Sequence, residues 1–177
     1  MHWFGIIGCV LSLAAIGWHI SNLLVGRRQL RLQEAEREFG AVLQAAHSEC
    51  TAGFARAFSG LPVPAAVAAA ALIQHPRFRS LDPAEMRAIE FLCHSLDELS
   101  KEGAWEFSEL SGSNAESRVR RYLDLRHRLK VFSGVLVRRN LTHESPVPEL
   151  SERLKHEAKR ALQEAGTTNA MELFNQL

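Results

Sequence analysis

One stretch of the chain places side chains that could bind a metal ion or transfer protons at regular spacing. Glu90, His94 and Glu98 are four residues apart, with Asp97 beside them, and metal sites in helical bundles use such ligands. Those sites, however, draw their ligands from several helices that face a common interior. A helical projection at about 100° per residue places the three side chains opposite the apolar side of their own helix. We therefore interpret them as an exposed charged face and expect no metal site there.

The cysteines and one nearby histidine are the other candidates for catalysis. Cys50 follows His47 by three residues, but no third group in the local sequence would orient the pair for nucleophilic chemistry. Cys93 falls on the apolar side of its helix and is expected to be a small core residue. The chain contains no glycine-rich phosphate loop and no HExxH, GxSxG or paired CxxC motif. The sequence thus predicts a protein that is not an enzyme and uses no cofactor.

A stripe of small and polar residues near the N-terminus could hold a partner helix. Its members are spaced three and four residues apart, the repeat of one helical face. We call this stripe the seam, and it consists of Gly5, Gly8, Ser12, Ala15, His19, Asn22 and Gly26. In lipid, helices associate through small residues that permit close approach and through polar groups that hydrogen-bond across the interface. The seam therefore predicts contact with a transmembrane helix of another membrane subunit or of a second copy of this chain.

Two further roles stay open for the polar residues of the seam. His19 and Asn22 lie close to Trp18, a residue type enriched at the membrane interface, so they could merely mark the cytoplasmic boundary. His19 could also relay protons, because ionisable residues inside membranes often serve in proton pathways. The sequence supplies no partner for such a relay.

The element that carries the seam has the length and apolarity of a membrane span. Residues 3–25 contain no Asp, Glu, Lys or Arg, and a helix of that length rises about 34 Å against a hydrocarbon core of about 30 Å. Arg27, Arg28 and Arg31 follow the span, whereas only His2 precedes it. This order is the reverse of a secretory signal peptide. By the positive-inside rule, the sequence predicts an anchor in the cell (inner) membrane, with the N-terminus outside and the C-terminal domain in the cytoplasm.

Beyond the anchor, the sequence predicts helices and no sheet. Residues 27–59 lack proline and repeat apolar residues at helical spacing, so the anchor helix should continue to about residue 59, before Gly60 and the sequence LPVP. At 82–85, the sequence DPAE is typical of a capped helix start. The chain is thus expected to be all-α, with a transmembrane anchor (1–26), a juxtamembrane helix (27–59) and the remainder of a cytoplasmic helical bundle (60–177).

A basic helix is the strongest signal for a cytoplasmic partner. Residues 114–141 hold eight Arg or Lys residues against two acidic residues, in a chain whose net charge is +1. Five arginines group away from the apolar side and form what we call the basic face: Arg120, Arg121, Arg128, Arg138 and Arg139. This face could pair with acidic residues of the chain itself, such as those at 34–38, bind an acidic partner, or meet anionic lipid. Nucleic acid fits least, because no aromatic platform or groove-reading motif accompanies the charge.

Together these patterns predict a single-pass, membrane-anchored accessory or scaffolding subunit of a membrane protein complex. The odd number of widely spaced cysteines (Cys9, Cys50 and Cys93) favours a reducing compartment for the bundle. The alternative is a membrane-tethered signalling or defence regulator whose basic helix binds a nucleotide or nucleic acid. High salt would separate the two, because a phosphate-binding face weakens in salt whereas an intramembrane seam does not.

Overall fold

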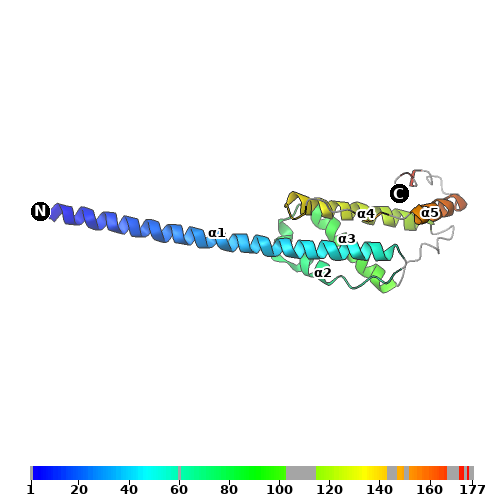
Figure 1. Cartoon of the computed structure of the whole chain (residues 1–177), viewed down its shortest axis with the longest axis horizontal. Helices are drawn as coiled ribbons and strands as arrows, with labels where there is room; N and C mark the ends of the chain where they lie inside the picture. Colours follow the sequence, from blue (N-terminus) through cyan, green and yellow to red (C-terminus); the bar gives the residue numbers. More distant parts are fainter. Residues whose placement is uncertain are drawn as a thin grey trace. The chain divides into compact units, whose positions relative to one another are not determined.

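The computed structural model describes residues 2–59, 61–102, 115–142, 147–149, 152–166, 172–173 and 175, without the side chains of residues 2–15, 102 and 115. Its elements are α1 (His2–Ala57), α2 (Val67–Gln74), the 3₁₀ turn η1 (Pro76–Ser80), α3 (Pro83–Glu102), α4 (Ala115–Arg138) and α5 (Glu152–Glu164) (Figure 1). Within the described ranges every regular element is helical. The predicted all-α class is therefore confirmed. The chain divides into two compact units, residues 1–39 and residues 40–177.

The long first helix ends close to the predicted position. Helix α1 runs to Ala57, and the backbone N–H groups of Ser59 and Leu61 both donate to the carbonyl of Arg56, at 3.0 Å each. The Arg56 side chain in turn donates from Nε to the carbonyl of Pro62 at 3.0 Å. These bonds satisfy carbonyl groups that the last helical turn leaves without an intrahelical donor. The helix thus stops where the proline-containing segment begins, as the sequence predicts.

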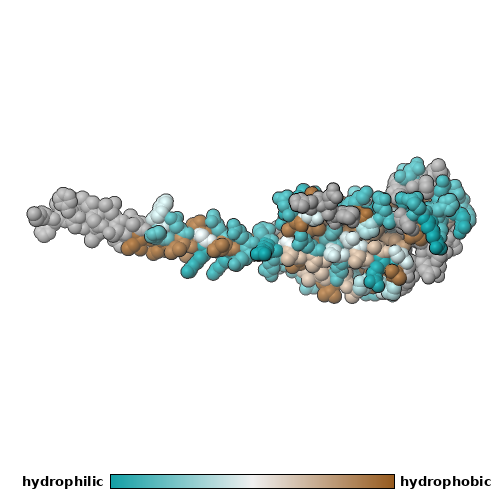
Figure 2. Space-filling view, viewed as in Figure 1, coloured by the Kyte–Doolittle hydropathy of each residue, from teal (hydrophilic) through white to brown (hydrophobic). Residues whose placement is uncertain are grey.

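The described side chains of the first unit lie mostly on the surface. Ile16, Ile20, Leu23 and Leu24 are 53–64% exposed, and Figure 2 shows brown apolar side chains along this part of α1. Among the residues that the structure describes, no helix is both long and apolar enough to cross a bilayer. The side chains of residues 3–15, more than half of the predicted span, lie outside the described set. The helix is confirmed, whereas membrane crossing stays a prediction.

In the second unit, the apolar stripes of the helices meet in one core. Helix α3 packs on α4, α4 packs on α5, and α2 and η1 lie against α3. The largest fully buried side chains come from α1, α2, α3 and α4, and include Leu43, Phe54, Leu72, Leu92, Leu96, Tyr122, Leu129 and Phe132. Burying one such side chain contributes about 1.5–3 kcal/mol. The shared core fixes which faces of α3 and α4 point outward.

Helix α3 begins with the capping arrangement that the sequence predicts. Oδ1 of Asp82 accepts the Ala84 N–H at 2.8 Å, and Oε2 of Glu85 accepts the Asp82 N–H at 3.3 Å. Pro83 occupies the first helical position, where its missing N–H costs nothing. The two carboxylates thus satisfy orphan donors at the helix start.

Helix α4 ends on a residue in the left-handed conformation. Asn140 has φ 55°, and the N–H of Leu141 donates to the carbonyl of Leu136 at 3.0 Å. This pairing satisfies a carbonyl of the last turn, as glycine or asparagine commonly allows at a helix C-terminus. The carbonyl of Leu141 then accepts the Gln44 side-chain N–H at 2.6 Å. The end of α4 is thereby tied to α1 within the second unit.

Candidate functional site

The structure describes the side chains of only three of the seven seam residues, His19, Asn22 and Gly26. His19 and Asn22 are exposed, Gly26 is half-buried, and a Cβ added at Gly26 would have no other atom within 4 Å. The side chains at Gly5, Gly8, Ser12 and Ala15 lie outside the described residues, although their backbone belongs to α1. Because all seven positions lie on one continuous helix, their three-and-four spacing places them along one face. The available part of this face is uncovered.

Arginines follow the seam without a gap in the helix. Arg27, Arg28 and Arg31 are exposed. At about 100° per residue, they fall on the same side of α1 as Ile16, Ile20 and Leu24. One side of the helix therefore changes from apolar to basic within about one turn.

The basic face of α4 is engaged by carboxylates of the second unit. Arg120 pairs with Glu116 at 2.7 Å and Arg128 with Asp124 at 2.9 Å, both within α4. Helix α3 supplies the other two partners: Glu98 lies 3.6 Å from Arg121, and Glu85 pairs with Arg138. Half-buried Arg139 completes the face. Four of the five predicted residues thus contact acidic groups of their own chain. These partners lie on α3 and α4, whereas the internal-pairing interpretation names the acidic residues at 34–38.

An arginine of α4 and a partly exposed phenylalanine of α3 stack where the two helices meet. The Arg128 guanidinium lies 3.8 Å from the ring centroid of Phe91, whose side chain is 44% exposed. With Arg87, Glu90 and His94 they line a shallow hollow of about 420 Å³. The stacking is worth about 0.5–1 kcal/mol at an exposed site. At about 100° per residue Phe91 falls beside His94 and Glu98 on the outer side of α3, so the projection agrees with its exposure. The contact with Arg128, in contrast, depends on how α3 meets α4.

The metal-ligand candidates lie on this same outer surface. His94 is 71% exposed and approaches Glu98 at 3.3 Å, while Glu90 is also exposed. Among the described residues, no three His, Cys, Asp or Glu side chains are grouped to hold a metal ion. The exposed charged face that the helical projection predicts is confirmed for Glu90, His94 and Glu98.

Residues with reactive side chains gather instead in the interior of the second unit. Nε2 of His47 lies 2.8 Å from Oγ of Ser133, and the two residues are 86 positions apart. The Ser133 hydroxyl donates to the Leu129 carbonyl at 3.0 Å, so it accepts from His47, whose Nε2 carries the proton. The imidazole also meets the Phe132 ring edge-on, with centroids 5.1 Å apart. Burial lowers the pKa of His47, which favours the neutral imidazole.

Two cysteines lie in the same interior. The Sγ atoms of Cys50 and Cys93 are 3.9 Å apart, across α1 and α3. The hydrogen bond with Cys93, together with burial, raises the pKa of the Cys50 thiol. A protonated thiol is a poor nucleophile, and His47 is only 6% exposed. The arrangement supports the interpretation of these residues as core groups rather than a catalytic pair.

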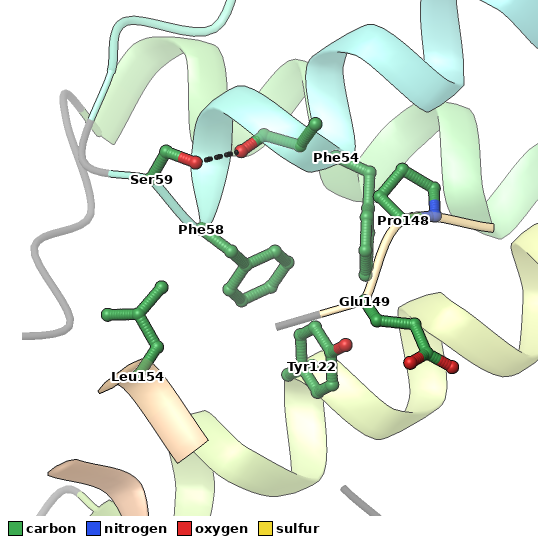
Figure 3. A pocket seen from close by; sticks show the side chains of 8 residues that line it. Phe54, Phe58, Ser59, Tyr122, Pro148, Glu149 and Leu154 are labelled. Atoms are coloured by element: carbon green, nitrogen blue, oxygen red, sulfur yellow. Dashed lines mark hydrogen bonds between the residues drawn. The ribbon is translucent and has the colours of Figure 1, made fainter. Parts of the chain in front are cut away.

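A small aromatic pocket lies where α1 and α4 meet the chain before α5 (Figure 3). The rings of Phe54, Phe58 and Tyr122 pack in tilted and edge-on pairs with centroids 4.9–5.3 Å apart. They line a cavity of about 160 Å³. Glu149 contributes a carboxylate at its edge, which accepts a hydrogen bond from Arg126 at 2.7 Å. The pocket has the chemistry of a small apolar cavity with one anionic group. The sequence pattern predicts that these aromatic residues are buried, but it does not predict that they line a pocket.

Comparisons with protein families, with curated proteins and with solved structures found no match for this chain.

Proposed function

We propose that this chain is a single-pass membrane anchor protein that serves as an accessory or scaffolding subunit of a membrane complex. Residues 3–25 cross the membrane, the N-terminus lies outside, and the helical bundle lies in the cytoplasm. One observation carries the proposal: an uncharged stretch of sequence falls wholly within one continuous helix, and its described large apolar side chains are 53–71% exposed. Exposed apolar surface of this extent marks contact with a membrane or a partner.

The apolar side chains of this helix gain free energy when another apolar surface removes them from water. Covering a Leu or Ile side chain contributes about 1.5–3 kcal/mol, and Ile16, Ile20, Leu23 and Leu24 are all more than half exposed. Hydrocarbon covers such side chains on every side of a helix at once. Trp18 and Val25, which at about 100° per residue fall on the other side of α1 from these four, are also exposed. A lipid environment therefore accounts for exposed apolar side chains on both sides of the helix.

The arginines after the span support its orientation. Arg27, Arg28 and Arg31 are exposed and follow the last apolar residues directly. Long basic side chains at a helix end reach the headgroup layer, where anionic lipids of the cytoplasmic leaflet attract them at about 1 kcal/mol each.

The seam is the proposed surface for the partner helix. Its described members, His19, Asn22 and Gly26, are not covered by other parts of the described chain. Small residues allow close helix approach in lipid, and each polar side chain can add about 0.6–2 kcal/mol through an interhelical hydrogen bond. The partner is a transmembrane helix of another subunit or of a second copy of this chain.

The seam is tested by adding bulk to it. In Gly8→Leu and Ser12→Leu the added side chains should separate the two backbones, so that less partner co-purifies per unit of membrane-inserted chain. Both changes make the span more apolar, so insertion itself should not suffer. Leu11→Ile and Leu13→Ile, which lie off the seam, are the matched controls and should retain the partner. Equal recovery of partner by the seam variants and the controls would show that the seam is not an interface.

A further inference from the structure

We propose that Cys50 and Cys93 are a disulfide-forming site that joins α1 to α3 when a peroxide oxidises the folded bundle. The sulfur atoms lie 3.9 Å apart although the two residues are 43 positions apart in the chain. Both thiols are free, and both side chains are buried, with exposures of 0% for Cys50 and 4% for Cys93. At this separation the two sulfurs are in direct contact, so no other atom lies between them.

The bond requires a local adjustment rather than a rearrangement of helices. A disulfide needs its sulfurs at about 2.05 Å, so the two atoms must approach by about 2 Å. We expect rotation of the two cysteine side chains about χ1 to supply this movement. The surrounding core holds the helices in place, because Leu92 and Leu96 of α3 and Phe54 of α1 are fully buried beside the cysteines in sequence.

The two thiols differ in how they meet a reagent. Cys93 retains slight exposure, whereas Cys50 has none, so a small oxidant reaches Cys93 first when the surface opens locally. The hydrogen bond with Cys93 and burial raise the pKa of Cys50, which keeps it a protonated thiol at neutral pH. The pair therefore persists as two thiols until an oxidant is supplied.

The oxidation proceeds in two balanced steps with hydrogen peroxide as the oxidant. Peroxide transfers one oxygen atom to the Cys93 sulfur, which gives a sulfenic acid and releases one water molecule. The Cys50 sulfur then attacks the Cys93 sulfur, the S–S bond forms, and the sulfenic hydroxyl leaves with the Cys50 proton as a second water. Two thiols thus lose two electrons and two protons in total, and the peroxide is reduced to water.

The bridge would close a loop that contains α2 and η1. It would also secure the contact in which the Glu49 carboxylate accepts the N–H groups of Val67 and Ala69 at 3.0 and 2.9 Å. Closing a long loop restricts the unfolded chain and raises the stability of the folded one. Oxidation should therefore raise the melting temperature of the bundle by several degrees.

The test uses the purified full-length chain with Cys9→Ser, which leaves Cys50 and Cys93 as its two thiols. Treatment with hydrogen peroxide should lower the intact mass by about 2 Da, as loss of two hydrogens requires. Peptide mapping should recover a linked Cys50–Cys93 peptide, and dithiothreitol should restore both the mass and the original melting temperature. The same treatment of Cys9→Ser/Cys50→Ala should give no loss of mass.

Two outcomes would overturn the proposal. One is oxygen addition at Cys93, a gain of about 16 or 32 Da, without any disulfide. The other is a bridge that forms only after the chain is unfolded in urea, since the folded contact would then have no part in it. The intact mass and the peptide map of the Cys9→Ser chain alone distinguish these results, so the test does not depend on whether the alanine variant folds. Neither result depends on whether the chain is anchored in a membrane.

Discussion

His47 is buried in the core, where its surroundings favour the neutral imidazole. It donates to Ser133, lies against the Phe132 ring and has a lowered pKa because of burial. Protonation is therefore easier in the unfolded chain, where the pKa lies near its ordinary value of about 6.5. The stabilising contribution is fully present above that value and is lost as the pH falls below it, at up to about 1.4 kcal/mol per pH unit.

We predict that the stability of the chain falls between pH 7 and pH 5 more steeply than that of His47→Gln. Glutamine keeps a side-chain amide that can donate to Ser133 but has no titratable group. Thermal unfolding followed by circular dichroism across this pH range would measure the difference. Parallel pH profiles for the two proteins would contradict a role for His47, because the remaining histidines titrate in both.

At the residue scale, local spacing shows which side chains are reactive but not which of them meet. His47 and Cys50 lie on one helical face, and the sequence indicates no third group near them. His47 instead contacts Ser133, 86 positions away, and Cys50 contacts Cys93, 43 positions away. Such contacts depend on which faces of separate helices pack together, and no short pattern in the chain encodes this.

At the element scale, α3 and α4 are joined across their surface by charge. The Arg121 guanidinium lies 3.6 Å from the Glu98 carboxylate, and both side chains are partly exposed. We predict that Arg121→Glu lowers the free energy of unfolding by about 0.5–1 kcal/mol, the range of exposed ion pairs. The double change Arg121→Glu/Glu98→Arg should recover most of this loss, as chemical denaturation can measure.

Lys130→Glu is the matched control, because it makes the same charge change at an exposed position of α4. It should affect stability less than Arg121→Glu. Should Arg121→Glu leave stability unaltered but reduce recovery of a cytoplasmic partner or of anionic lipid, the basic face would be a docking surface rather than an internal one.

The helices themselves were largely predictable because their signals are local. Periodic apolar residues and the absence of proline predict α1 up to its end, and DPAE predicts the start of α3 with its cap. The start of α2 is different: its N–H donors are satisfied by Glu49, about 20 positions earlier on α1. Likewise, the partners of Arg121 and Arg138 come from α3. Contacts between elements therefore mark the limit of what periodicity predicts.

At the scale of the whole molecule, the two units present different surfaces. The second unit buries most of its large apolar side chains in a core of its own, whereas Ile16, Ile20, Leu23 and Leu24 of the first unit are more than half exposed. A single solvent cannot favour both arrangements equally, since exposed apolar surface is costly in water and neutral in lipid. In the proposed division, the anchor lies in lipid, which favours its exposed apolar side chains, and the bundle lies in water, which favours its buried core.

Alkaline carbonate extraction of membranes that contain the full-length chain tests the proposed anchor most directly. The chain should stay in the membrane pellet, and Leu13→Ile should stay there too. Leu13→Arg places a charge near the middle of residues 3–25, at a cost of about 2.5–3.5 kcal/mol for insertion, and should shift the chain into the supernatant. Extraction of the unaltered chain by carbonate, or retention of Leu13→Arg to the same extent as Leu13→Ile, would contradict a membrane span in this segment.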